Sequence, residues 1–138
     1  MSRVVHITCA ACDAVNRIPA DKLTAAPRCG RCKHVVFSGE PVNLSEANFQ
    51  RMISKNEIPV VVDFWAPWCG PCRAMAPAFT AAAAKLEPDF RLAKLNTEEA
   101  QTIAATFQIR SIPTLIVFKS GQEIDRISGA LMGAQLEQ

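Results

Sequence analysis

Six cysteines arranged in three Cys-x-x-Cys pairs constrain this 138-residue chain more than any other feature. The pairs are Cys9/Cys12, Cys29/Cys32 and Cys69/Cys72, and no cysteine falls outside them. The first residues lack the long apolar run and the small-residue cleavage site of a secretion signal, which makes a static disulfide framework the less favoured interpretation. The pattern therefore indicates metal binding or redox chemistry.

Turn-forming residues at 38–41 interrupt the hydrophobic pattern and divide the chain. Residues 1–40 hold two cysteine pairs and few large apolar side chains, whereas residues 41–138 hold the third pair and most of the aromatic and β-branched runs. We predict one domain in each part.

The formal net charge of +2 gives no general reason to expect a nucleic acid or membrane partner. We expect a cytoplasmic monomer.

Beyond residue 41 the hydrophobic pattern alternates between strands and helices. Strands are predicted at residues 59–65, 90–95, 114–118 and 122–127, the last two joined as a hairpin. Helices are predicted after a Ser45 cap, with Phe49, Met52 and Ile53 on one face, over 70–87 with a kink at Pro77, and over 97–107 with Thr97 as cap. This alternation favours an α/β fold with a central mixed sheet flanked by helices. After Gly129 there is room for about two helical turns.

The third cysteine pair lies in Trp68-Cys69-Gly70-Pro71-Cys72, where a buried strand is followed by a helix. Two cysteines three residues apart at a helix start can form a disulfide. The free N–H groups and the dipole of the helix would stabilise a Cys69 thiolate, while Cys72 lies a turn deeper and more shielded. This arrangement suits thiol–disulfide exchange, and the alternative is a pair of buried structural cysteines.

The run from Val61 to Cys72 resembles the signature of the thioredoxin family, and Ala93–Asn96, Ile112–Leu115, Gly121 and Gly129 recur downstream in the family's order. The two N-terminal pairs are similar to those of its zinc-containing bacterial thioredoxin 2 type. The resemblance implies a thioredoxin fold preceded by a small zinc ribbon. It also implies a protein-disulfide reductase without a bound organic cofactor, which acts on oxidised client proteins and is recharged by NADPH-dependent thioredoxin reductase.

The resemblance implies residue roles as well. Cys69 would attack the client disulfide, Cys72 would resolve the mixed disulfide, and Asp63 would help to move the proton of Cys72 while Lys94 faces it. The residues expected to meet the substrate are Trp68, Gly70, Pro71, Ile112, Pro113 after a cis bond, and Gly129. Independently, Asp63 interrupts an apolar run, and burial raises the pKa of a carboxyl group. The simpler alternatives are a satisfied buried carboxylate at Asp63 and a solvent-directed Lys94.

Sixteen residues separate Cys9/Cys12 from Cys29/Cys32, a spacing within the range of four-cysteine zinc sites. We predict one structural Zn²⁺ on these four cysteines, because a segment with so few large apolar residues needs a metal for stability. Two disulfides, free thiols, an iron–sulfur cluster or a ligand role for His34 remain alternatives. The segment could also dock a protein or nucleic acid, or sense oxidants.

Overall fold

The computed structural model describes residues 3–129 and begins with a small antiparallel sheet. Strand β1 (Val4–Thr8) pairs with β2 (Val15–Pro19), and the short 3₁₀ helix η1 (Ala20–Lys22) follows. A long loop then carries the second cysteine pair. We call residues 3–40 the N-terminal segment. Its interior is small and apolar, built from Val5, Ile7, Ile18, Val36 and the buried cysteines.

The second part is a five-stranded sheet in the order β3-β5-β4-β6-β7. The strands are β3 (Val42–Leu44), β4 (Val60–Trp65), β5 (Arg91–Asn96), β6 (Thr114–Lys119) and β7 (Gln122–Ser128). β3, β5 and β4 run parallel, whereas β6 and β7 are antiparallel to their neighbours. The helices are α1 (Phe49–Lys55), α2 (Gly70–Leu86) and α3 (Gln101–Thr106).

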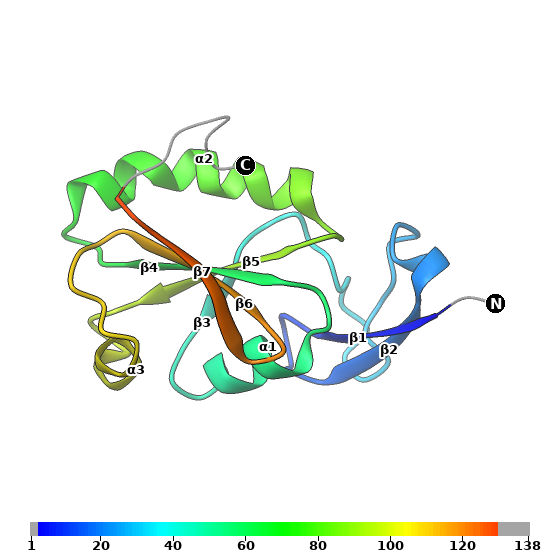
Figure 1. Ribbon diagram of the computed structural model, residues 1–138. Helices are drawn as coiled ribbons and strands as arrows, with labels where there is room; N and C mark the ends of the chain where they lie inside the picture. The colour runs from blue at the N-terminus through cyan, green and yellow to red at the C-terminus, as the bar shows by residue number, and fades with distance from the viewer. Residues whose placement is uncertain (1–2, 130–138) are drawn as a thin grey trace.

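The helices lie on both faces of this sheet, with α2 on one face and α1 and α3 on the other (Figure 1). Apolar side chains of β4, including Val60, Val62 and Phe64, are fully buried between these layers. The predicted mixed sheet flanked by helices, the thioredoxin fold, is confirmed. None of the helices within residues 3–129 combines the length and the apolar character of a membrane-spanning segment. The helical turns expected after Gly129 lie outside the described residues.

Two predicted helix starts are wrong. α3 begins at Gln101, because the N–H and hydroxyl of Thr97 both donate to the carbonyl of Trp65 (2.8 and 3.1 Å) and so extend the pairing of β5 with β4. α1 begins at Phe49, after a turn in which the hydroxyl of Ser45 accepts a hydrogen bond from Ala47 N–H (3.2 Å). Thr97 and Ser45 thus shape turns before the helices and do not cap them.

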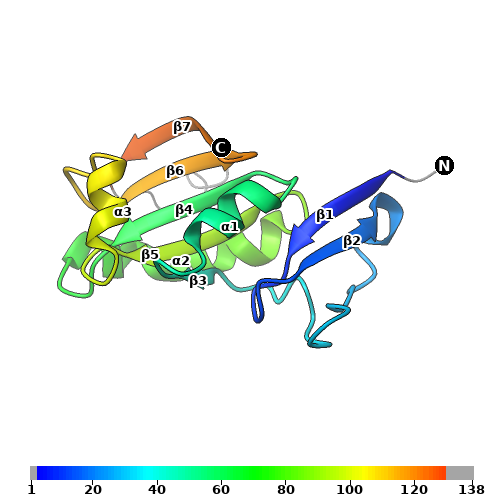
Figure 2. The ribbon, with the colours of Figure 1, turned by 90° about the horizontal axis from the view of Figure 1, so that it is seen from below.

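The N-terminal segment lies at the end of the sheet where β4 begins and α2 ends (Figures 1 and 2). Ile58, just before β4, packs in the same apolar cluster as Val5 and Ile7. The side chain of Asn56 accepts a hydrogen bond from Thr8 N–H (2.9 Å). The N-terminal segment thus lies near the end of α2, whereas Cys69 and Cys72 lie at its start. The 17 residues of α2 span about 25 Å.

Candidate redox site and metal centre

Cys69 and Cys72 form a disulfide at the first turn of α2, with their Cα atoms 5.2 Å apart. Cys69 is the N-cap residue, and its Sγ accepts a hydrogen bond from Cys72 N–H (3.2 Å). Pro71 occupies the first turn, where its missing N–H removes no helical hydrogen bond. Both cysteines are almost fully buried. The expected approach of the two sulfur atoms is therefore confirmed.

The side chains expected to meet the substrate gather beside the disulfide. Trp68 projects from the surface with 65% of its area exposed. The Ile112–Pro113 peptide bond is cis, and the Ile112 carbonyl lies 3.8 Å from Sγ of Cys69. The N–H of Gly129 donates to the Pro113 carbonyl (2.8 Å), which brings the end of β7 to the same place. The structure thus brings together Trp68, Gly70, Pro71, Ile112, Pro113 and Gly129.

Asp63 lies in the middle of β4 and is 1% exposed. Within the described part of the chain, its Oδ1 atom has no hydrogen-bond partner. Burial raises the pKa of this carboxyl group to about 7, against the opposing effect of the positive charge of Lys94. Lys94 is the register partner of Asp63 on β5, and its Nζ atom lies 4.4 Å from the centre of the Trp65 ring. The expected burial of Asp63 is confirmed.

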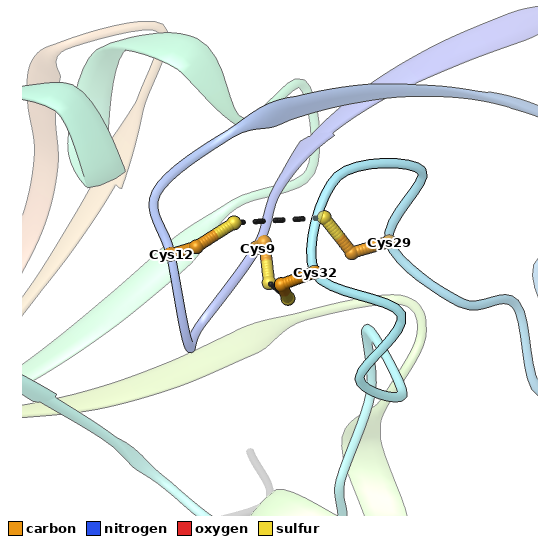
Figure 3. Close-up of side chains that lie close together, drawn as sticks. All are labelled: Cys9, Cys12, Cys29 and Cys32. Atoms are coloured by element: carbon orange, nitrogen blue, oxygen red, sulfur yellow. Dashed lines mark hydrogen bonds between the residues drawn. The ribbon is translucent and has the colours of Figure 1, made fainter.

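The four N-terminal cysteines come together, and their Sγ atoms all lie within 4.8 Å of one another (Figure 3). The Sγ atoms of Cys9 and Cys32, and those of Cys12 and Cys29, are 3.6 Å apart. Zn–S bonds of about 2.3 Å in a tetrahedron require sulfur atoms about 3.8 Å apart. None of the four forms a disulfide. The donor set therefore fits one zinc ion.

The two cysteine pairs have the same backbone geometry. The first sulfur of each accepts a hydrogen bond from the N–H two residues later, Ala11 in one and Arg31 in the other (3.3 and 3.4 Å). The fifth residue of each turn, Asp13 or Lys33, has a positive φ of 64° or 69°. Such repeated turns present two sulfur atoms each to a common point. We refer to them as the first and second knuckle. His34 is a neighbour of the site, with Nδ1 3.4 Å from Sγ of Cys32.

The sequence analysis missed Arg91 at the start of β5. Its side chain is completely buried, although it carries a charge. Nη2 donates to the carbonyl of Thr8 (2.7 Å), and Nη1 donates to the carbonyl of Val36 (2.9 Å) and to Oε2 of Glu87 (3.4 Å). Burial lowers the pKa of this guanidinium, whereas the charges of Glu87 and Cys9 raise it. No local pattern singles it out, because Arg91 stands at the first position of β5, where a charged residue is ordinarily exposed.

A mixed sheet whose long helix begins with a disulfide-bonded Cys-x-x-Cys pair defines a thiol–disulfide oxidoreductase. The family pattern described as "Thioredoxin" matches residues 40–138, and the one described as "Thioredoxin 2, N-terminal", a zinc ribbon, matches residues 8–34. The chain belongs to the thioredoxin family.

Curated relatives agree with this assignment. Thioredoxin C-3 of Corynebacterium nephridii is 46% identical over 96% of this chain and 90% of its own length. Thioredoxin of Porphyra purpurea is 47% identical over 68% of this chain and 88% of its own length. The chloroplastic M-type thioredoxin of Chlamydomonas reinhardtii is 37% identical over 88% of this chain and 89% of its own length.

Proposed function

We propose that this protein reduces disulfide bonds of client proteins through Cys69 and Cys72. The Cys69 thiolate attacks one sulfur of the client disulfide, forms a mixed disulfide and releases the other client sulfur as a thiolate. Cys72, once deprotonated, attacks Sγ of Cys69 and releases the second client thiolate. The client gains two electrons and binds two protons, and the Cys69–Cys72 disulfide forms.

The observation that carries this proposal is the position of Cys69 Sγ at the N-terminus of α2, where it accepts the N–H of Cys72. Backbone N–H groups and the helix dipole at this end favour a sulfur anion, which is the attacking form of a cysteine. The exposed Trp68 and the Ile112 carbonyl beside the sulfur give an extended client segment an apolar and a polar contact.

We propose that Asp63 accepts the proton of the Cys72 thiol. Lys94 would adjust the pKa of Asp63. Burial raises the pKa of Asp63 to about 7, so that the carboxyl group can take up and release a proton near neutral pH. Lys94 opposes this rise through its positive charge from the neighbouring strand. A base with such a pKa suits the step in which Cys72 becomes a nucleophile.

The family membership supports two further parts of the proposal. The oxidised pair would be reduced again by an NADPH-dependent thioredoxin reductase, in the cytoplasm. The four cysteines of the N-terminal segment would hold one structural zinc ion, which supplies a cross-link between the two knuckles when bound. We propose that residues 1–40 and 41–138 form the zinc-ribbon and thioredoxin domains.

Insulin reduction, coupled to NADPH oxidation by thioredoxin reductase, tests the proposed reaction. Cys69→Ser is expected to abolish turnover, because no attacking thiolate remains. Cys72→Ser is expected to accumulate mixed disulfides, because the resolving thiol is missing; these are visible on non-reducing gels. Thr80→Ala, on the exposed side of α2, is the matched control and retains activity. Full turnover by Cys69→Ser contradicts the proposal.

Elemental analysis tests the proposed metal. After anaerobic purification we expect about one zinc per chain, because four thiolates saturate a tetrahedral ion. Cys12→Ser removes one ligand and is expected to lower the zinc content, while Ser38→Ala in the same segment leaves it unchanged. Absence of stoichiometric metal from the unaltered protein contradicts a zinc site.

A further inference from the structure

We propose that Arg91, a residue of the five-stranded sheet, is a positioning residue for the four-cysteine metal site. The inference rests on the zinc binding proposed above and adds a residue outside the N-terminal segment to that site. Its basis is the path of the Arg91 side chain, which leaves β5 and donates hydrogen bonds to two carbonyl groups of the N-terminal segment.

These two carbonyl groups flank the four cysteines along the chain. Thr8, bound at 2.7 Å, directly precedes Cys9 in the first knuckle. Val36, bound at 2.9 Å, follows the second knuckle, and its own N–H donates to the Pro27 carbonyl (2.9 Å) ahead of that knuckle. One guanidinium group therefore connects the chain entering the first knuckle with the chain leaving the second.

The guanidinium is well suited to this connection because its donors are held in one rigid plane. A bond to each carbonyl consequently sets the separation of the two knuckles as well as their individual positions. The knuckles each supply two of the four sulfur atoms, so their separation decides whether the four atoms can reach a common ion. Metal ligands that are oriented by a surrounding shell of hydrogen bonds bind more tightly than ligands left free to move.

Two side chains hold the Arg91 guanidinium group in place. Oε2 of Glu87 lies 3.4 Å from Nη1, and Cζ of Arg91 lies 4.8 Å from the centre of the Phe37 ring. The other carboxylate oxygen of Glu87 accepts a hydrogen bond from Gly39 N–H (2.9 Å), at the end of the N-terminal segment. These contacts fix the guanidinium group beside Glu87 at the end of α2.

Charge favours the same arrangement. Four thiolates and one Zn²⁺ carry a net charge of about −2, and two of the four sulfur atoms belong to buried cysteines. Arg91 is a buried cation hydrogen-bonded to the carbonyl group directly before Cys9. A buried charge of one sign needs a partner of the other, so the loaded site and Arg91 stabilise each other.

The test is the zinc affinity of full-length Arg91→Met, measured by competition with a chromophoric chelator. We expect the dissociation constant to rise by about 10- to 100-fold, the usual effect of losing a group that orients metal ligands. Arg91→Lys keeps the charge but cannot span both carbonyl groups, and we expect it to recover part of the affinity. The control is Arg51→Met, because the exposed Arg51 donates to the first knuckle alone, at the Asp13 carbonyl (2.6 Å), and so does not set the separation of the two knuckles. Its affinity is expected to stay unchanged.

Cobalt substitution separates positioning from general stability. We expect the visible and thiolate-to-cobalt bands of Arg91→Met to shift from those of the unaltered protein, and those of Arg51→Met to coincide with them. A folded Arg91→Met with unaltered zinc affinity and cobalt spectrum overturns the inference. Arg91→Met could fold only with excess zinc. In that case the readout is the zinc concentration at which half of the protein is folded, and a higher concentration than for Arg51→Met supports the positioning role. If Arg91→Met does not fold at all, the zinc affinity of Arg91→Lys is the test. An affinity of Arg91→Lys equal to that of the unaltered protein overturns the inference.

Failure of the proposed zinc function gives a different result. An unaltered protein that binds no zinc removes the metal site and this inference together. An unaltered protein that binds zinc, with Arg91 variants that bind it equally well, leaves the metal site intact and refutes only the role of Arg91.

Discussion

Asp63 is a carboxyl group buried away from water. It is 1% exposed in the centre of β4, and within residues 3–129 its Oδ1 atom has no hydrogen-bond partner. An ionised carboxylate in such a place loses its hydration and gains little in return. This desolvation, opposed by Lys94, is why the pKa lies at about 7. The same feature that suits Asp63 to proton transfer therefore weakens the fold.

The raised pKa predicts how stability depends on pH. Below about pH 4 the carboxyl group is protonated in the folded and unfolded protein, and no penalty arises. Between about pH 4 and 7 the unfolded state ionises first, so the free energy of unfolding falls, and it levels off above about pH 7. Asp63→Asn cannot ionise and is expected to be more stable at pH 8 by up to about 4 kcal/mol.

Urea unfolding of the oxidised protein at pH 4 and pH 8 measures this effect. The exposed Asp89→Asn is the matched control and is expected to show little difference between the two values. If Asp63→Asn raises the free energy of unfolding by the same amount at both pH values, the raised pKa of Asp63 is not the cause, and the prediction is contradicted.

At the scale of single elements, α1 is held to the sheet by an aromatic contact. The ring of Phe49 meets the rings of Phe64, Phe107 and Phe118 edge-on, with centroids 6.3, 5.6 and 5.7 Å apart. Phe49→Ala is expected to lower the free energy of unfolding by about 3–5 kcal/mol, because it leaves a cavity in the core. Denaturant titration checks this, with the exposed neighbour Gln50→Ala near the unaltered value. A loss below about 1 kcal/mol contradicts the role of Phe49 as the anchor of α1.

The turn between β6 and β7 depends on Gly121. Its φ is +85°, and its N–H donates to the Ile53 carbonyl of α1 (2.9 Å). A Cβ atom there would lie 3.1 Å from Oγ of Ser54. Gly121→Ala is therefore expected to cost about 1 kcal/mol or more in thermal or urea unfolding. Gly70→Ala, whose Cβ would meet nothing within 4 Å, is the control; equal stability of the two variants contradicts the prediction.

Elements with a strong local pattern were predicted to within a residue. The apolar run of β4, the hairpin of β6 and β7, and the long helix α2 all follow from hydrophobic period and turn residues. β3 was missed because a strand of three residues carries too little periodicity. The start of α3 was misplaced because the hydrogen bonds of Thr97 to β4 override its preference for a helix cap.

At the scale of the whole molecule, the N-terminal segment and the sheet share buried contacts. Ile58 belongs to the apolar cluster of the N-terminal segment, and the Glu57 carboxylate pairs with His6 of β1. Arg91 and Asn56 add buried hydrogen bonds across the same boundary. We therefore expect both parts to unfold together.

Metal removal tests this expectation. Because binding to the folded state stabilises it, chelation of zinc is expected to lower the Tm while calorimetry still shows one transition. The control is the same chelator saturated with zinc, which leaves the Tm unchanged. Two separate transitions, or no change in Tm on metal removal, contradict the shared unfolding.

The sequence by itself determined the α/β class, the pairing of Cys69 with Cys72 and the convergence of the other four cysteines, because each follows from short spacings and local periodicity. Only the tertiary structure decided that the four-cysteine cluster lies at the far end of α2 from the redox pair. It also decided that Arg91 enters the N-terminal segment, through hydrogen bonds to residues 83 and 55 positions away. Contacts over such separations arise from how whole elements pack, and no local pattern in the chain specifies them.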